Sequence, residues 1–459
     1  MMETYDLVVV GGGLLGTAIA RDAALRGLSV TLFEAEDFGA GAVSRGSRLL
    51  LGGLGALGTL DFTQVRDDIK EREILLQTLP HWVRPQTCLV PFYKDSLLVQ
   101  ARLRAGLALA DALGFDHALR VHQLLSAKAA QKRAPCLRPA GLLGAALVWE
   151  AVIPNIERLA RELAFDARRN GAVLHSHTSV EALVRELGRG GRERVSGVWW
   201  KNRLSGETGR TDASLVIVAS GGGSAALLER SVGTLTKTVS VLHAPVPGLS
   251  DALVFPQEDT PALLLALPTE TGCRAGSITT DYQAGDPAYA TGAEITALAH
   301  ALRSYLPGFE FAGVSQAEAA LHCQIVPGEE VSDAGANGGR CDGLLSVSGA
   351  GLTRFRRVAE EAVDLACRKL GRALSVPPCR TATTPLPEPS GPTDADCLTL
   401  RDYLEHSLPL DWTPEQRNAG MPSALTALSA KHGWDVARQA AEVKAWSAET
   451  ALRQTFRVL

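Results

Sequence analysis

The sequence predicts an α/β fold with a parallel-sheet domain, an inserted domain built mainly on an antiparallel sheet, and a short C-terminal helical region. The first observation is that the opening fifty residues alternate an apolar run, a glycine-rich turn, an alanine-rich helix and a second apolar run, as a βαβ unit does. The second is that two later apolar runs, 215–219 and 344–348, also end in glycines. The third is that proline-punctuated apolar segments between 238 and 275 are typical of antiparallel strands.

Length and composition narrow the functional classes. A chain of 459 residues with 46% hydrophobic residues is expected to form two or three domains. The formal net charge is -4, and no basic stripe interleaved with aromatics occurs, so we expect no nucleic-acid partner. The eight cysteines are scattered without a CxxC pair, which favours a reducing compartment and indicates neither a zinc site nor a disulfide framework.

The sequence also allows predictions about the location of the protein in the cell. The N-terminus runs directly into a predicted strand, which leaves no room for a signal peptide. No run of eighteen apolar residues occurs, so no membrane-spanning helix is expected. We therefore expect a cytoplasmic protein, and peripheral contact with the inner face of the membrane stays open.

The first motif predicts a dinucleotide site in a Rossmann-like domain. The strand 6–10 is followed by Gly11, Gly13 and Gly16, and Glu34 ends the next strand. Glycines allow a tight turn and a close approach to a pyrophosphate, which the positive end of the following helix attracts. A carboxylate about twenty residues later can accept hydrogen bonds from ribose hydroxyls. A glycine turn without a ligand is the weaker explanation, because strand, helix, second strand and acid all occur in order.

The remaining elements follow from apolar periodicity and turn residues. The strand 172–177 is expected to close at Val180, and a hairpin is expected around Trp199 and Trp200. Prolines concentrated between 377 and 392 mark a linker. The other expected segments are the helices 61–79, 97–113, 156–170, 292–305 and 353–370, the strand 85–93, the mixed stretch 119–147, and the helical end 398–459.

Two later glycine turns are candidates for the same ligand. Ser220 to Gly223 follows a buried strand, which suggests a second pass of backbone along the cofactor, although an ordinary glycine-rich turn would look the same. Gly349 to Gly351 leads into a helix N-terminus, which is suited to an anion.

At this point the sequence resembles the FAD-dependent glycerol-3-phosphate dehydrogenases, within the wider group of D-amino-acid-oxidase-like flavoproteins. The matching stretches spread over residues 5–390, and the C-terminal part is only loosely similar. These stretches are 9–13, 19–24, 26–30, 71–76, 280–282, 359–364 and 379–382.

The resemblance implies a discontinuous domain organisation. The FAD-binding domain would comprise 1–80, 150–235 and 340–375, and the substrate domain 81–149 and 236–339. A proline-rich linker, 376–397, would lead to the C-terminal helical region, 398–459.

The resemblance also implies the chemistry, in which a hydride passes from a secondary alcohol carbon of glycerol 3-phosphate to FAD, and electrons then pass to a quinone or to oxygen. The protein would then be an oxidoreductase of glycerol metabolism with a small-molecule substrate; its oligomeric state is not implied. The residues that would hold FAD are Gly11, Gly13, Leu14, Leu15, Gly16, Glu34, Ala35, Ser44, Ser47, Arg48, Val180, Ser220, Gly221, Gly349, Leu352 and Thr353.

The substrate side departs from the family pattern. The family's His-Gly-Gly-Leu-Arg-Tyr stretch stands here as residues 51–56, without the histidine, arginine or tyrosine. A second family histidine is replaced by Ser240, a family arginine by His322 and a family lysine by Gly351. A buried phosphate dianion needs cationic donors, so we expect glycerol 3-phosphate not to be the substrate.

Two residues are candidates for the missing chemistry. His322 could act as a base because its ordinary pKa lies near neutrality, and a purely structural histidine is the alternative. Arg354 could replace a lost cation, or it could be a solvated helix residue. His175, His177 and His243 receive no role.

Three functions stay open: an FAD-dependent oxidoreductase with an altered, less charged alcohol or amine substrate, an unaltered glycerol-3-phosphate dehydrogenase that relies on Arg354, and a catalytically inactive FAD-binding paralogue with a structural or regulatory role. No metal site is expected.

Overall fold

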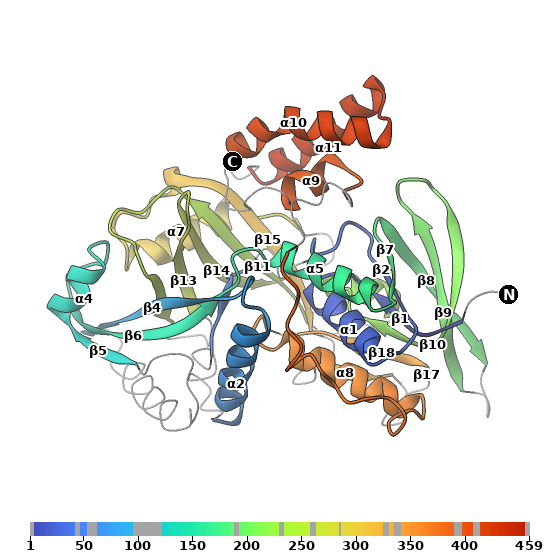
Figure 1. Ribbon diagram of the computed structural model, residues 1–459. Coiled ribbons are helices and arrows are strands. Elements are labelled where there is room, and N and C mark those ends of the chain that lie inside the picture. Colours follow the sequence, from blue (N-terminus) through green and yellow to red (C-terminus); the bar gives the residue numbers. More distant parts are fainter. Residues whose placement is uncertain are drawn as a thin grey trace.

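The protein is built on two nine-stranded sheets, with a helical region at the C-terminus (Figure 1). The computed structural model describes residues 4–41, 46–52, 62–94, 122–187, 192–228, 234–257, 263–283, 286–324, 330–334, 341–349, 351–389, 397–406 and 414–454.

The first sheet is centred on β1 (Thr4–Val10), which pairs in parallel with β2 (Val30–Phe33) and β10 (Thr208–Val218). Alternate β1 residues face opposite layers. Leu7 and Val9 belong to the same core as helices α1 (Leu14–Leu25), α5 (Ile156–Arg169) and α8 (Phe355–Lys369). Val8 and Val10 belong to a core shared with β8 (Thr178–Leu187) and β9 (Glu193–Asn202). The remaining strands are β7 (Val173–His175), β16 (Val331–Asp333), β17 (Cys341–Asp342) and β18 (Leu344–Val347).

The second sheet runs in the order β15-β11-β14-β13-β12-β4-β6-β3 and is mostly antiparallel. Helix α7 (Gly292–Arg303) shares a core with one face of the sheet through Ile295, Leu298 and Leu302. Helix α2 (Phe62–Thr78) contributes Val65 to a second core of the sheet. The strands are β3 (Leu49–Leu50), β4 (Arg84–Tyr93), β5 (Gln123–Ser126), β6 (Leu142–Val152), β11 (Thr234–His243), β12 (Ala252–Pro256), β13 (Leu263–Pro268), β14 (Cys273–Asp281) and β15 (Val314–Gln324), and the short helix α4 (Ala127–Arg133) lies beside β5.

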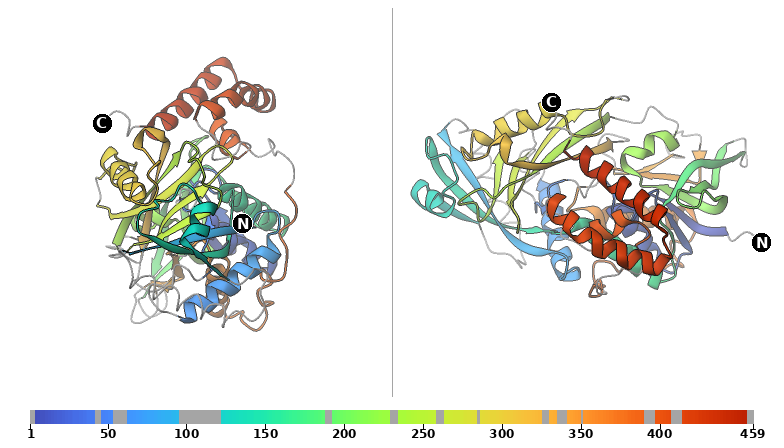
Figure 2. Two further views of the ribbon diagram at one scale, coloured as in Figure 1. Left: turned by 90° about the vertical axis from the view of Figure 1, so that its left-hand side faces the viewer. Right: turned by 90° about the horizontal axis from the view of Figure 1, so that it is seen from above.

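The C-terminal helices α9 (Leu400–His406), α10 (Pro414–His432) and α11 (Val436–Leu452) share a small core of their own. They lie over the region between the two sheets (Figure 2). The backbone N–H of Ala317 in β15 donates to the carbonyl of Arg453 (3.0 Å), and Asp402 bonds His177 beside the first sheet. The helical region therefore touches both domains.

Most expected elements form within one or two residues of their predicted ends, and the differences have local causes. Val180 does not close the strand that begins near 172. That strand ends at His175, a turn follows in which His177 adopts φ 49°, and Val180 belongs to the next strand, β8. The expected helix 97–113 lies outside the described residues.

Two short strands cross the expected domain limits. Strand β3 pairs with β6 of the second sheet, and β16 pairs with β18 of the first sheet. Strand β3 thus lies about thirty residues before the expected limit at 80/81, and β16 lies about seven residues before the limit at 339/340.

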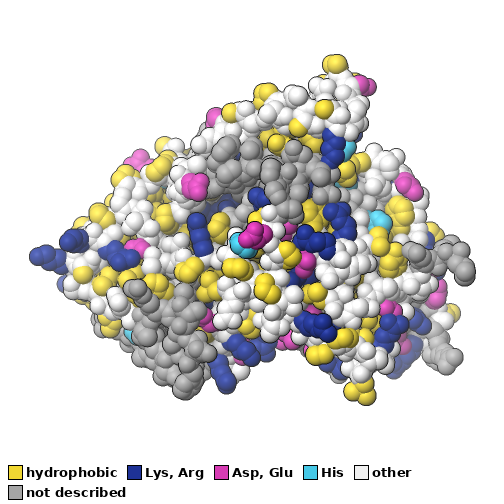
Figure 3. Space-filling model, viewed as in Figure 1, with side chains coloured by type: hydrophobic (Ala, Val, Ile, Leu, Met, Phe, Trp, Pro, Cys, Tyr) yellow, Lys and Arg dark blue, Asp and Glu magenta, His cyan; other side chains and the backbone are white. Residues whose placement is uncertain are grey.

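No helix among the described residues is long and apolar enough to cross a membrane. On the face shown in Figure 3, Lys and Arg side chains are spread among Asp and Glu side chains over several elements.

Candidate functional site

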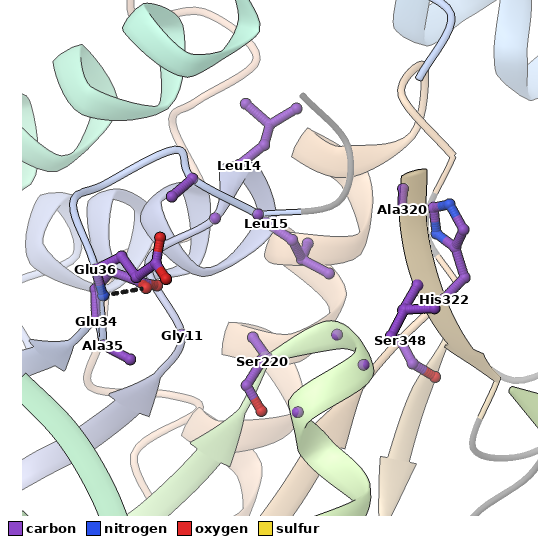
Figure 4. Close-up of a pocket in the computed structure, with 18 of the residues that line it drawn as sticks. Gly11, Leu14, Leu15, Glu34, Ala35, Glu36, Ser220, Ala320, His322 and Ser348 are labelled. Carbon is purple, nitrogen blue, oxygen red and sulfur yellow. Dashed lines mark hydrogen bonds between the residues drawn. The ribbon is translucent and has the colours of Figure 1, made fainter. Parts of the chain in front are cut away.

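A cavity of about 1100 Å³ runs from the end of β2 to strand β15 of the second sheet. Figure 4 shows Glu34, Ala35 and Glu36 at one end and Ala320, His322 and Ser348 at the other, with Ser220 and Leu15 between them. The cavity is thus bounded by both sheets, and its long shape suits an extended ligand.

The first glycine turn allows backbones to approach closely at the centre of the cavity. Gly11 has φ 106°, and a Cβ there would lie 2.7 Å from the carbonyl oxygen of Ala219. A Cβ on Gly16 would lie 1.8 Å from the carbonyl oxygen of Gly11. Helix α1 begins after Gly13, its N-cap residue, which has no side chain to cap that end. Its N-terminal N–H groups and dipole are therefore suited to an anionic group such as a pyrophosphate.

Glu34 stands at the tip of β2 in the position expected for ribose recognition. Its carboxylate accepts hydrogen bonds from the backbone N–H of Gly12 (2.6 Å) and of Glu36 (2.8 Å). Burial raises the pKa of Glu34, and the charges of Glu36 and Asp37 raise it further, against the two N–H donors. The carboxylate is thus held in place by the backbone.

The two later glycine turns also reach the cavity. Ser220, Gly221, Gly349 and Leu352 all line it, as do Ser47 and Val180. The residues of the predicted set that line it are Gly11, Gly13, Leu14, Leu15, Glu34, Ala35, Ser47, Val180, Ser220, Gly221, Gly349, Leu352 and His322.

Four predicted residues are situated differently. Gly16, which packs against the carbonyl of Gly11, and the buried Thr353 are not part of the lining. Arg48 is buried and donates to the carbonyl of Pro154 (2.5 Å) instead of lining the cavity. Ser44 lies outside the described residues.

His322 lies at the far end of the cavity, on β15. It pairs with Thr236 of β11, and Thr236, Thr238 and Ala320 line the cavity beside it. Burial lowers the pKa of His322 below its ordinary value of 6.5. The imidazole is therefore neutral at neutral pH and can accept a proton.

Arg354 is not part of the cavity lining. Its guanidinium lies 2.9 Å from Glu330 and 4.0 Å from Asp68. The arginine expected as a substitute cation is thus paired with a carboxylate from another segment.

Sequence reasoning missed several lining residues, among them Thr236, Thr238, Ser277 and Arg203. The two threonines alternate along β11, and that spacing could have indicated a shared polar face. Arg203 reaches the cavity from the β9–β10 turn, where its Nη1 donates to the carbonyl of Ala35 (3.2 Å). That contact spans 168 residues, and nothing local in the sequence signals it.

Comparison with known proteins identifies the protein family. The chain matches the FAD dependent oxidoreductase family over residues 6–365. It belongs to this family. The glycerol-3-phosphate dehydrogenase of Synechocystis is 30% identical over 415 residues, covering 83% of this chain and 73% of that protein. The aerobic glycerol-3-phosphate dehydrogenase of Staphylococcus saprophyticus is 28% identical over 80% of this chain and 68% of that protein.

Solved structures agree with this family of FAD-dependent oxidoreductases at the level of the fold. The glycerol-3-phosphate dehydrogenase of Bacillus halodurans, complexed with FAD, superposes with a TM-score of 0.73 at 21% identity, covering 98% of this chain and 95% of that one. The glycine oxidase of Geobacillus kaustophilus gives a TM-score of 0.62 at 19% identity, covering 84% of this chain and 100% of that one.

The cavity fits the family's cofactor, FAD. The glycine cradle, the start of α1 after Gly13 and the oriented carboxylate of Glu34 provide what a pyrophosphate and a ribose require. As a member of this family, the oxidoreductase binds FAD. We propose that FAD lies along the cavity, with its adenosine end at Glu34.

We expect Gly16→Ala to disrupt this cradle. The added methyl would overlap the carbonyl oxygen of Gly11 at 1.8 Å, and overpacking of about 1–3 kcal/mol, if it falls on the bound state, corresponds to FAD binding about 5- to 150-fold weaker. FAD affinity can be measured by titrating the apoprotein and following flavin fluorescence.

Gly27→Ala is the control for this test. Gly27 has φ 81° but open space around its Cβ position, so the substitution should cost about 1 kcal/mol of stability and leave FAD affinity unchanged. Wild-type FAD affinity in Gly16→Ala would contradict the described geometry.

Proposed function

We propose that this FAD-dependent oxidoreductase oxidises an uncharged alcohol or amine rather than glycerol 3-phosphate. The observation that carries the proposal is the make-up of the cavity around His322. Among the described residues, this end offers the hydroxyls of Thr236, Thr238 and Ser277 and a neutral imidazole, but neither lysine nor arginine.

The cations nearest in sequence to this end have other partners. Lys237 lies between the two threonines on β11, so its side chain leaves from the opposite face, where its Nζ lies 2.8 Å from Glu294. Arg274 on β14 lies 2.6 Å from Glu318. A phosphate at this end would therefore lose its water without gaining a cation from the described lining, which costs several kcal/mol.

The same lining supports a role in proton transfer for His322. Bound FAD supplies the acceptor for the hydride that leaves the substrate carbon. The proton of the substrate hydroxyl or amine passes to a ring nitrogen of His322, which is neutral and can take it. The threonine and serine hydroxyls orient the substrate by hydrogen bonds.

We further propose a quinone or another small oxidant as the final electron acceptor, with peripheral contact at the membrane. This part rests on the family resemblance alone.

The first test is anaerobic reduction of the purified, FAD-loaded protein by a panel of compounds. We expect a neutral polyol or an amine to bleach the flavin absorbance, and glycerol 3-phosphate to need a concentration at least about a hundredfold higher, since about 3 kcal/mol of desolvation is left uncompensated. Bleaching by glycerol 3-phosphate at the lowest concentration of the panel would contradict the proposal. Bleaching by none of the compounds would favour the alternative, an FAD-binding paralogue without turnover.

A second test addresses His322. With the best reducing compound from the panel, His322→Asn should slow flavin reduction by a factor of about 10²–10⁴, the usual contribution of a general base. Because the pKa of His322 is lowered from 6.5, the wild-type rate should be level near pH 7. The rate should fall only when the pH drops below 6.5 and the imidazole of His322 takes up a proton.

His300→Asn is the matched control, because His300 is an exposed histidine at the end of α7 in the same domain. It should leave both the rate and its pH profile unchanged. An unchanged rate in His322→Asn would remove His322 from the proposed reaction.

A further inference from the structure

The carboxylate edge at the adenosine end of the cavity, residues 34–37, carries an excess of negative charge. Glu34, Glu36 and Asp37 lie within four residues, and the charges of the last two raise the pKa of Glu34, whose burial already raises it. The ribose contact needs Glu34 ionised and correctly turned. The neighbouring charge of Glu36 must therefore be offset and kept apart from it.

Arg401 of helix α9 offsets Glu36 from the other end of the chain. Its Nη1 donates to Glu36 Oε2 at 2.7 Å, a contact that spans 365 residues. Arg203 lies 3.8 Å from Glu36 Oε1 on the cavity side. Burial works against the charge of Arg401, but Glu405, Glu36 and Glu449 outweigh burial and raise the pKa of Arg401. The guanidinium is thus a permanent positive charge beside the edge.

Asp402, the next residue of α9, contacts the carboxylate edge indirectly, through His177. The Nε2 of His177 lies 2.9 Å from Asp402 Oδ2, and both side chains are buried. The backbone N–H of His177 donates to the carbonyl of Glu36, and that of Thr178 to the carbonyl of Glu34, each at 2.7 Å. A displacement of His177 would therefore be transmitted directly to the backbone that carries Glu34.

Helix α9 is itself well fixed. Asp402 Oδ2 also accepts the backbone N–H groups of Leu398 (3.0 Å) and Thr399 (2.9 Å) at the start of the helix. Arg453 bonds Glu405 of α9, and its carbonyl accepts the N–H of Ala317 in β15. These contacts hold helix α9 in a fixed position against both domains.

We propose that Arg401 and His177 are positioning residues for FAD, through which helix α9 holds the carboxylate edge in the shape that binds the adenosine ribose. The C-terminal helical region thereby sets the affinity of the protein for its cofactor. This inference rests on the FAD site itself and is independent of the substrate.

The test is the FAD dissociation constant of full-length variants, measured by titrating apoprotein with FAD and following flavin fluorescence. We expect Arg401→Ala to weaken FAD binding about tenfold, in the usual range for coupling between distant elements, and Arg401→Lys to restore most of the affinity because it restores the charge. Thermal unfolding of each apoprotein shows whether the variant is folded.

Arg372→Ala is the matched control. Arg372 also forms a 2.7 Å bridge across the chain, in this case to Asp6 over 366 residues. Asp6 lies near the start of β1, whereas the cavity lies at the other end of that strand. This variant should keep wild-type FAD affinity.

The pH profile supplies a measurement that a merely structural contact would not move. Burial alone would lower the pKa of His177, but the hydrogen bond and charge of Asp402, with the charges of Asp37 and Glu36, raise it overall. The cations Arg401 and Arg203 lie on the other side of Glu36. The protonated pair with Asp402 is present below 6.5 and is lost as the pH rises through the raised pKa. In the wild type, FAD affinity should therefore decrease as the pH increases through the raised pKa of His177.

His177→Asn should bind FAD more weakly than the wild type at low pH and show no such fall. The proposal is overturned if Arg401→Ala and His177→Asn, both folded, bind FAD within a factor of about two of the wild type across this pH range. If Arg401→Ala does not fold, His177→Asn alone decides by the same criterion.

Discussion

The proposed FAD site depends on one close approach of backbones, between the turn 11–16 and the end of β10. The N–H of Gly11 donates to the carbonyl of Phe33, and the N–H of Ala219 to the carbonyl of Val10, each at 2.8 Å. The carboxyl ends of β2, β1 and β10 are therefore joined at one point, with the start of α1 directly behind them. A Cβ on Gly11 would lie 2.7 Å from the carbonyl oxygen of Ala219, so glycine is required for the three strands to end together.

The same constraint extends to the second domain. The glycines 221–223 follow Ala219 and pack against β15, where a Cβ on Gly222 would lie 3.1 Å from the Cβ of Leu321. His322 is the next residue of that strand. The distance between the glycines 221–223 and His322 is thus set by a contact in which one partner, Gly222, has no side chain. The parallel sheet positions the proposed FAD site, and this contact positions the His322 end of the cavity relative to it.

The sequence was most informative where the structure is local. The turn at Gly11, Gly13 and Gly16 and the acid Glu34 lie within one βαβ unit, so spacing alone located them. Val180 was expected at the end of a strand and instead lies on the following one, because a turn at His177 with positive φ left no glycine signal. The contacts of Arg401 with Glu36 and of His177 with Asp402 join segments more than two hundred residues apart. No periodicity or motif in the sequence predicts such a pair, because each partner resembles an ordinary polar surface residue in its local sequence.

The charges around His322 bear on the proposal of an uncharged substrate. Recruiting Arg274 to a phosphate would separate it from Glu318, and both side chains are buried, with exposed fractions of 3% and 10%. Burial alone would raise the pKa of Glu318, but Arg274, through its charge and hydrogen bond, together with the charges of Arg453 and Arg48, holds it at about 2. Removing the partner of a buried charge costs about 3–5 kcal/mol, while a ligand that binds at millimolar concentration gains only about 4 kcal/mol. The cost would therefore cancel the gain, whereas a neutral substrate bound by hydroxyls leaves the Arg274–Glu318 pair intact.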